Sequence, residues 1–540
     1  MGMKFHLHEL LWRNPILWMG VRRQLRPKAV IVWGLITFIT CLFIFLNVYN
    51  SWSFSNYGGQ SEANALALKT CFIPMLIAQG IILMFLGTGS VAGGMAEEKE
   101  SGLLDYQRLT PMMPLSKIIG YLFGLPSREY LLFALTLPFT LIATIGGQIP
   151  FMKVLLLYAI FFCVVLAYHL TAMVAGMLAK KPRRASWFAR IMVVLLYIFL
   201  PALSQMGLTV FGHLTILPTL WGLLESELGE NYSEEFLELW EVVPFFSWNL
   251  PPALFSFLIL GFLMVVFVSI LLRKWQQDTN HSMTKYFAIG VFAILQFLMT
   301  GSLMPHLDKN VDTSIFLKEI FPFEAELAGA ILLIHLLLSL IASILLLHLI
   351  TPTRHILLKG SRRAEKLTLK KIPFNWDAAG SLVSGLAFIG ITSIGFGGLL
   401  AAAMQTPSIE NEIPRHLLPL PAILFTSMVL YIQAARTIWP TAGFFGFLAL
   451  LWILPELTGL TLTAFTRNGD PLFYFGITNP LHALYYTLAL YFEAFKEGTG
   501  PKIHENITQT AYLTLAFHGC LAIFFQLKAR RWKQNLALKS

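Results

Sequence analysis

The segment MAEEKESGLLDYQRLTPMMPLSKIIGY, Met95–Tyr121, is rich in charges and contains two prolines, yet long apolar runs flank it on both sides. Each flanking run has the roughly 20 residues that a helix needs to cross the hydrocarbon layer of a bilayer. A helix also pairs its own backbone polar groups, which hydrocarbon requires. The segment is therefore predicted to connect two membrane-spanning helices.

The chain as a whole is too apolar for a soluble protein. Of its 540 residues, 56% are hydrophobic and 13% are charged, and its mean hydropathy is +0.67. A soluble body of this size could not cover so much apolar surface. The apolar runs predict an all-α polytopic membrane protein with about 12 transmembrane helices. These runs lie at about 29–49, 68–93, 118–147, 151–179, 187–213, 252–272, 286–304, 325–350, 378–403, 417–436, 440–463 and 508–527.

Lysine and arginine are distributed unevenly between the connections, and this asymmetry predicts the orientation. Basic connections stay on the cytoplasmic side of a membrane. Here they lie before the first span and after the fourth, sixth, eighth and twelfth spans, as Arg13, Arg22, Arg23, Arg26 and Lys28; Lys180, Lys181, Arg183, Arg184 and Arg190; Arg273 and Lys274; Arg354, Lys359, Arg362, Arg363, Lys366, Lys370 and Lys371; and Lys528, Arg530, Arg531 and Lys533. We therefore expect the inner membrane of a bacterium, with both termini in the cytoplasm. Retained basic loops account for the net charge of +10, so no nucleic-acid partner is required.

The two halves of the chain share one layout. After an N-terminal interfacial helix in residues 1–28, residues 29–274 form a first six-span domain and residues 275–540 a second, more divergent one. In each half, the outer connection between the fifth and sixth spans holds an apolar stretch too short to cross, which predicts re-entrant or interfacial helices. The layout favours two parallel six-helix halves. The alternative is a coincidence of loop lengths, since the halves share little obvious sequence.

Two short amphipathic segments are predicted on the cytoplasmic side. In the first, Leu7, Leu10, Leu11, Ile16, Leu17 and Val21 lie beside a basic face, as in a helix in the inner leaflet. Pro15 is expected to break or kink this helix. The second segment, at about residues 97–113, starts with a charged exit, that is, the charged residues that directly follow the second span. A short helix comes next, and prolines end it. The residues of this segment are Glu97, Glu98 and Glu100 in the exit, Leu103, Leu104, Tyr106, Arg108 and Leu109 in the helix, and Pro111 and Pro114 at the end. Such a helix would be a rigid element on which another protein could exert force.

The second segment resembles the coupling region of the ABC-2 permease superfamily, the membrane subunits of type-2 ABC exporters. The similar residues are EEKESGLLDYQRLTPMMPLSKIIGYLFG, from Glu97 to Gly124, and an NP…R..LR pattern made by Asn14, Pro15, Arg22, Arg23, Leu25 and Arg26. The resemblance implies six-span units, outer half-helices, and a coupling helix whose residues from Glu97 to Pro114 contact an ATPase subunit. Tyr121 departs from the lysine that the family commonly has after Gly120. The second half departs too, because RHILLKGSRRAEKLTLKK at 354–371 has no acidic exit.

The chain carries no nucleotide-binding motif of its own. No G-x-x-x-x-G-K-[ST] phosphate loop occurs in it, so separate ABC ATPase subunits would bind ATP and Mg and hydrolyse the nucleotide. The chain itself is expected to bind no cofactor or metal and to be no enzyme, since its cysteines lack metal-ligand spacing. We expect a permease subunit of an exporter that lies in the lipid bilayer. A homo- or hetero-oligomer and an accessory envelope protein stay open as further partners.

Two other classes of membrane protein are alternatives. An ion-coupled twelve-span secondary transporter also has parallel halves, but it needs ionisable residues near the membrane midplane. The spans of this chain are poor in such residues. A membrane-embedded enzyme needs a cluster of catalytic side chains, and none is visible in the sequence.

A few ionisable residues do fall within predicted spans, where they are costly and often functional. Arg128 and Glu129 follow Pro126. As neighbours on a helix they are expected to point apart and not to pair, and a kink at the proline would leave them at the cytoplasmic boundary. Glu456 follows Pro455, which should loosen the eleventh span. Packing roles with hydrogen bonds are expected for His169, His335, His348 and His518.

Overall fold

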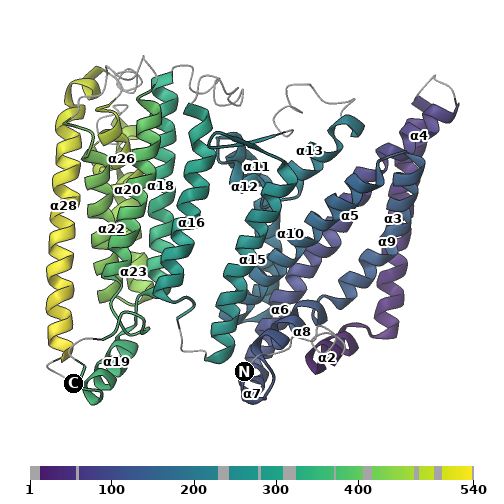
Figure 1. Ribbon diagram of the computed structural model, residues 1–540, viewed down its shortest axis with the longest axis horizontal. Coiled ribbons are helices and arrows are strands. Elements are labelled where there is room, and N and C mark those ends of the chain that lie inside the picture. Colours follow the sequence, from purple (N-terminus) through teal and green to yellow (C-terminus); the bar gives the residue numbers. More distant parts are fainter. Residues whose placement is uncertain are drawn as a thin grey trace. The chain divides into compact units, whose positions relative to one another are not determined.

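The computed structural model consists almost entirely of helices (Figure 1). It describes residues 13–55, 60–228, 242–277, 281–307, 324–369, 372–405, 416–466, 474–491 and 501–537. The described residues include 12 helices long and apolar enough to cross a membrane: Pro27–Trp52, Ala63–Glu100, Ser127–Gly146, Phe151–Leu178, Pro182–Gln205, Pro252–Gln276, Lys285–Leu307, Glu324–Ile350, Leu382–Ala403, Leu420–Ile438, Thr441–Phe465 and Ile507–Asn535. This confirms the predicted all-α multi-pass membrane fold, and it indicates a membrane transporter. Leu7, Leu10 and Leu11 of the N-terminal segment lie outside the described residues.

The chain divides into two compact units. Unit 1 comprises Met1–Ser204, Thr209–Val243 and Asn249–Thr279, and unit 2 comprises Gln205–Leu208, Pro244–Trp248 and Asn280–Ser540. The first six spans therefore belong to unit 1 and the last six to unit 2, apart from one residue at the end of the fifth span.

Unit 1 contains both long and short helices. They are α2 (Pro15–Gln24), α3 (Pro27–Ser55), α4 (Gln60–Thr70), α5 (Phe72–Gly80), the π-helix η1 (Ile81–Gly87), α6 (Thr88–Glu100), α7 (Leu103–Leu109), α8 (Pro114–Gly124), α9 (Ser127–Gly146), α10 (Phe151–Leu178), α11 (Pro182–Gln205), α12 (Thr209–Gly212), α13 (Leu217–Leu228) and α15 (Pro252–Gln276). The strands β1 (Val243–Phe245) and β2 (Trp248–Leu250) precede α15, and Pro244–Trp248 of these strands and their turn belong to unit 2. The short α12 and α13 agree with the expectation that this outer connection does not cross the membrane.

Two predicted boundaries in unit 1 need correction. The second span continues to the end of α6 at Glu100, so the charged exit is the last turn of that span and is not part of the short helix. The third span does not start at about residue 118, because α8 ends at Gly124 and α9 starts only at Ser127. Pro126 lies between them, and its ring prevents the regular helix from continuing.

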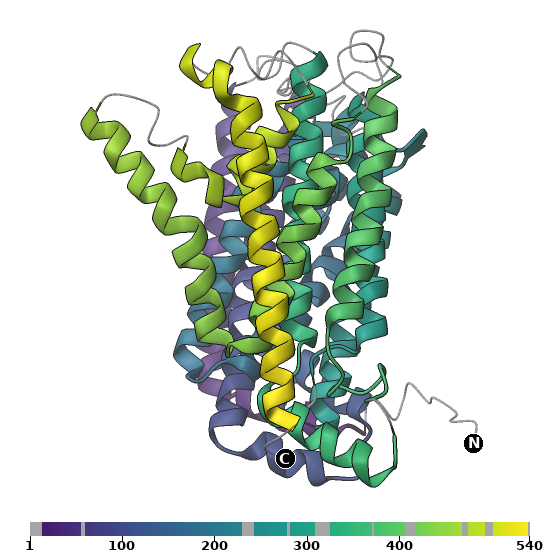
Figure 2. The ribbon, with the colours of Figure 1, turned by 90° about the vertical axis from the view of Figure 1, so that its left-hand side faces the viewer.

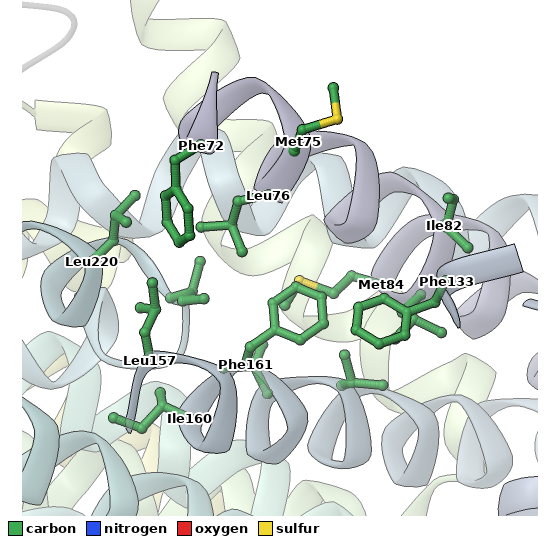
Figure 3. Close-up of a cluster of buried hydrophobic side chains, with 14 of the residues drawn as sticks. Phe72, Met75, Leu76, Ile82, Met84, Phe133, Leu157, Ile160, Phe161 and Leu220 are labelled. Atoms are coloured by element: carbon green, nitrogen blue, oxygen red, sulfur yellow. The ribbon is translucent and has the colours of Figure 1, made fainter. Parts of the chain in front are cut away.

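The core of unit 1 is a cluster of buried aromatic and aliphatic side chains (Figure 3). Phe133 of α9 stacks on Phe161 of α10 with ring centroids 5.9 Å apart, and Phe72, Met75 and Leu157 are buried around them. Lipid tails are as apolar as these side chains, so close van der Waals packing holds the helices together and not removal from water.

Unit 2 has the same mixture of long and short helices. They are α16 (Lys285–Leu303), the 3₁₀ turn η3 (Met304–Leu307), α18 (Glu324–Ile350), α19 (Arg354–Lys366), α20 (Leu382–Ala403), α22 (Leu420–Ile438), α23 (Thr441–Leu448), the π-helix η4 (Ala449–Ile453), α24 (Leu454–Thr466), the 3₁₀ turn η5 (Gly476–Thr478), α26 (Pro480–Leu488) and α28 (Pro501–Ala537). Phe292 of α16 stacks on Phe388 of α20 with centroids 4.4 Å apart. Helix α28 runs along the whole of unit 2 and ends beside α19 (Figure 2).

Candidate functional site

The short helix α7 lies beyond the ends of the long helices of unit 1 (Figure 1). Gly102, with a φ of 76°, lets the chain leave α6 and begin α7, because glycine adopts this left-handed conformation without strain. After α7, Thr110 is extended, and Pro114 occupies the first turn of α8, where a missing N–H costs nothing. Glycine and prolines therefore set off seven residues as a separate helix, as the sequence predicts.

The two faces of α7 differ from the expectation. The sequence places its four apolar residues on one side, but Leu104 is 2% exposed whereas Leu103, Tyr106 and Leu109 are 41%, 68% and 86% exposed. The exposed residues follow a spacing of three, so they share one face of the helix. Leu104 is thus unavailable to a partner. The other three form an apolar surface, which we call the α7 face.

The remaining residues of this segment are also placed by the structure. Arg108 forms an ion pair with Asp105 within α7. Pro111 is exposed, and Glu100 is exposed at the end of α6. Glu100 and Pro111 are thus accessible to another molecule, whereas the Arg108 side chain is 16% exposed and Glu98 is only 2% exposed.

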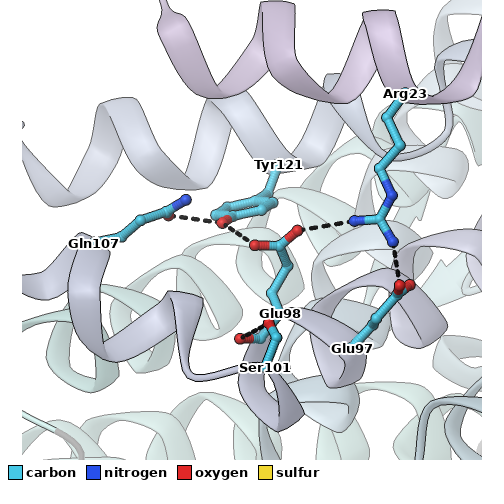
Figure 4. A network of polar contacts seen from close by, with 6 residues as sticks. All are labelled: Arg23, Glu97, Glu98, Ser101, Gln107 and Tyr121. Carbon is cyan, nitrogen blue, oxygen red and sulfur yellow. Dashed lines mark hydrogen bonds and ion pairs between the residues drawn. The ribbon is translucent and has the colours of Figure 1, made fainter.

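A polar network joins α2, α6, α7 and α8 behind the α7 face (Figure 4). Arg23 of α2 forms ion pairs with both Glu97 and Glu98, and its Nη1 lies 3.1 Å from Glu98 Oε1. The Tyr121 hydroxyl of α8 donates to Gln107 Oε1 at 2.6 Å and lies 3.1 Å from Glu98 Oε2. Burial and the neighbouring carboxylate of Glu98 raise the pKa of Tyr121, which keeps the hydroxyl protonated as a donor. We call this network, together with Lys117, the clamp. Glu98 lies inside it and is not exposed for contact with another protein.

Lys117 fixes the end of α7. Its Nζ donates to the carbonyl oxygens of Gln107 at 2.5 Å and Thr110 at 3.3 Å, the groups that a helix leaves unpaired at its C-terminus. Trp275 of α15 lies beneath this clamp, 5.8 Å from Lys117 Nζ and stacked on Tyr121 with centroids 5.7 Å apart. Lys117, Tyr121 and Trp275 thus connect α7 to α8 and α15.

Lys117 also makes the clamp sensitive to pH. Burial lowers its pKa from the ordinary value near 10.4. Between the lowered value and about 10.4 the unfolded chain binds more protons than the folded one, so the free energy of unfolding rises with pH in this window. We expect the unfolding midpoint of the wild type to rise relative to that of Lys117→Met as pH increases toward 10.4. A constant difference between the two midpoints across these pH values would contradict this prediction.

Helix α2 is seated on α8 through backbone contacts. Asn14 caps its N-terminus by accepting from the N–H groups of Ile16 and Leu17, and its Nδ2 donates to the Ser116 carbonyl at 2.7 Å. Pro15 occupies the first turn of α2 and Asn14 before it is extended, so the helix starts at this proline and does not run through it. A Cβ built on Gly20 would lie 2.7 Å from the backbone of Gly124. Only residues without side chains allow the two helices to approach this closely.

Arg128 and Glu129 were expected not to pair, and this is wrong. Arg128 Nη2 lies 2.6 Å from Glu129 Oε1, and the Ser90 hydroxyl donates to the same oxygen at 2.7 Å. Both residues belong to the first turn of α9, where a long guanidinium side chain can fold back on its neighbour. Glu129 is fully buried, and Arg128 lies 5.8 Å from the Trp33 ring.

Glu456 has two polar partners that the sequence does not reveal. Its Oε2 accepts from Asn479 Nδ2 at 3.2 Å and lies 3.0 Å from His482 Nδ1. The π-helix η4 ends two residues before Pro455, which agrees with the predicted loosening, since proline supplies no N–H to the regular ladder. The carboxylate thus joins α24 to the short helix α26.

The histidines in apolar helices have the packing roles that were predicted. His169 lies 3.0 Å from the Leu83 carbonyl, a group within the π-helix η1, and His518 lies 3.2 Å from the Ile477 carbonyl. His335 lies 3.5 Å from the Thr300 hydroxyl, and His348 accepts from Arg436 Nε at 3.1 Å.

Sequence reasoning missed Gln107, Lys117 and the role of Arg23 in the clamp. Two signals were present: Arg23 belongs to the NP…R..LR pattern, and Tyr121 replaces a common lysine. Neither signal identifies the partners, because Arg23 and Glu98 are 75 positions apart in the chain.

Comparison of the chain with protein-family models, curated proteins and solved structures gives no match.

Proposed function

We propose that this protein is the membrane permease subunit of an ABC transporter of the type-2 class, an exporter driven by a separate ATPase subunit. The observation that carries the proposal is the α7 face, where Leu103, Tyr106 and Leu109 point outward from a helix whose other side is clamped. An exposed apolar group on a rigid helix is typical of a protein–protein contact. The resemblance of this segment to the coupling region of ABC-2 permeases suggests that the protein that binds the α7 face is an ATPase subunit.

The clamp explains how a push on α7 would reach the spans. ATP and Mg would bind in the partner, which supplies the energy of nucleotide hydrolysis. Leu104 and Gln107 are buried on the inner side of α7, and Lys117 holds its end, so α7 would move together with α6 and α8. Lys99 Nζ donates to the Met177 carbonyl at 2.6 Å, which links α6 to the end of α10. A partner that shifts α7 would thereby tilt the spans and switch the access of a transport pathway.

The alternative, an ion-coupled secondary transporter, receives less support. Within the described residues the fully buried charged side chains are Glu98, Lys117, Glu129, Lys285 and Arg436. Each lies in the first or last turn of its helix. Ion-coupled carriers place such groups near the midplane of the membrane.

The proposal is tested by putting charges on the α7 face. The double variant Tyr106→Glu/Leu109→Glu is expected to lower co-purification of the ATP-binding subunit, and its stimulated ATPase activity, at least about tenfold, because two carboxylates must be desolvated in the contact. The matched control is Phe151→Glu/Met152→Glu, since these residues are 63% and 73% exposed at the start of α10, near the opposite ends of the spans. The control should keep the partner.

Two results would overturn the proposal. One is equal recovery of the ATP-binding subunit with the α7 variant and the wild type. The other is transport by the purified chain in vesicles that contain an ion gradient and no ATPase subunit, which would favour the secondary transporter.

A further inference from the structure

Helix α19 of unit 2 presents a basic surface. It connects the eighth and ninth spans, the place in unit 2 that corresponds in chain order to α7. Five of its basic side chains are exposed, and Glu365 is its one acidic residue. The five are Arg354, Lys359, Arg362, Arg363 and Lys366. None of them forms an ion pair within the described part of the chain.

The surface continues onto α28. The C-terminal end of this helix contacts α19, as both ribbon views show (Figures 1 and 2). Lys528, Arg530 and Arg531 are exposed there. We call the basic residues of α19 and these three residues the basic platform. Its excess of positive charge fits an anionic ligand that extends over several headgroups or side chains.

The fold holds the platform rigidly at the ends of the spans. Gly360 and Ala364, one helical turn apart, are buried on the inner side of α19. A Cβ on Gly360 would collide with Ala378 of the returning segment. Both ends of the connection are also joined, because the Thr351 hydroxyl donates to Ser381 Oγ at 2.8 Å. Gly360 and Ala364 therefore face the protein, which leaves the exposed basic side chains on the rest of the surface of α19, with Arg363 4.8 Å from the Trp376 ring.

The composition around the platform favours lipid over protein as the ligand. Leu367 and Leu369, directly after α19, are 52% and 41% exposed. Exposed leucines beside a row of lysines and arginines are typical of helices that lie at a membrane surface. The apolar groups enter the boundary of the acyl chains, while the basic groups meet acidic headgroups.

We propose that the basic platform binds the headgroups of anionic phospholipids and holds unit 2 at the bilayer surface. Unit 2 would then use its exposed helix for lipid, whereas unit 1 uses α7 for a protein partner. This inference is independent of the identity of that partner.

The experiment measures lipid retention by the purified full-length chain. The protein is equilibrated in mixed micelles with equal amounts of phosphatidylglycerol and phosphatidylcholine, and the lipids that stay bound are quantified by native mass spectrometry. We expect a preference for phosphatidylglycerol of at least about tenfold that declines as salt screens the charges. The variant Arg354→Gln/Lys359→Gln/Arg362→Gln/Lys366→Gln should lose this preference.

A matched control separates a built surface from the general effect of basic loops. Lys180→Gln/Lys181→Gln/Arg183→Gln/Arg184→Gln removes the same number of exposed charges from the connection between α10 and α11 and the first turn of α11. It should keep the preference within about twofold of the wild type. If the quadruple variant of α19 fails to fold, the single changes Lys359→Gln and Arg362→Gln are used, each with an expected loss of about fivefold.

Three outcomes would overturn the proposal. The wild type could show no preference for the anionic lipid. The control variant could lose as much preference as the α19 variant, which would mean that any basic loop suffices. Finally, the α19 variant could keep its lipids but lose a co-purified protein, which would assign the platform to an acidic protein partner.

Discussion

Replacing Arg23 by glutamate is expected to lower the free energy of unfolding of the protein by about 2 kcal/mol, less than for a fully buried ion pair, because the Arg23 side chain is 36% exposed and water screens its charge. The guanidinium of Arg23 is the ion-pair partner of Glu98, whose carboxylate is 2% exposed and has little access to water. The variant removes this partner and places a third carboxylate against Glu97 and Glu98. Because a buried charge without a counter-charge is strongly unfavourable, α2 should detach from α6. The midpoint of thermal unfolding in detergent measures the effect.

Arg22 provides the matched control, since it is the preceding residue of α2 and is exposed. Arg22→Glu makes the same change in net charge and should leave the unfolding midpoint near that of the wild type. Neutralising the buried acid should relieve the defect, so Arg23→Gln/Glu98→Gln is expected to be more stable than Arg23→Gln alone. Equal midpoints for Arg23→Glu and Arg22→Glu would show that the ion pair contributes no stability.

Replacing Gly20 by leucine is expected to cost about 3 kcal/mol of stability. A Cβ at this position would lie 2.7 Å from the backbone carbon of Gly124, which cannot move aside as a flexible side chain would. Helix α2 must therefore lift from α8, and the bond from Asn14 to the Ser116 carbonyl is lost with it. The variant should unfold at a lower temperature and retain less of the ATP-binding subunit.

The control for this change is Gly261→Leu in α15, because a Cβ at Gly261 has nothing within 4 Å. It adds the same side chain to a helix without a collision, so its unfolding midpoint should stay near that of the wild type. Gly20→Ala should lie between the two leucine variants. If Gly20→Leu and Gly261→Leu behave alike, the close approach of α2 and α8 is not needed for the fold.

These two predictions concern the same mechanical element. Arg23 and Gly20 both hold α2 against the helices that carry α7, one by charge and the other by the absence of a side chain. If a partner protein displaces α7, loss of either contact should weaken the coupling between that partner and the spans, even in variants that still fold. Variants of the α7 face should instead lose the partner without a change in the unfolding midpoint.

The sequence by itself determined the spans and the local breaks between helices. Hydrocarbon leaves no choice but a helix wherever about 20 apolar residues follow one another, so run length alone predicted all 12 spans. The start and end of α7 were equally local, because Gly102 permits a left-handed turn and Pro114 begins the next helix. The start of α2 at Pro15 was local as well, because the fixed φ that disrupts the interior of a helix suits its first turn.

Only the tertiary structure decided which side chains meet. Tyr121 and Gln107 join Glu98 because α7 connects α6 to α8, and Glu456 meets His482 because the turn η5, directly before α26, packs against α24. The same packing buries Leu104 and exposes Leu109, although both are leucines of one short helix. The physical reason is that helical periodicity specifies relative angles within a helix, whereas the direction that faces the protein depends on neighbours far away in the chain.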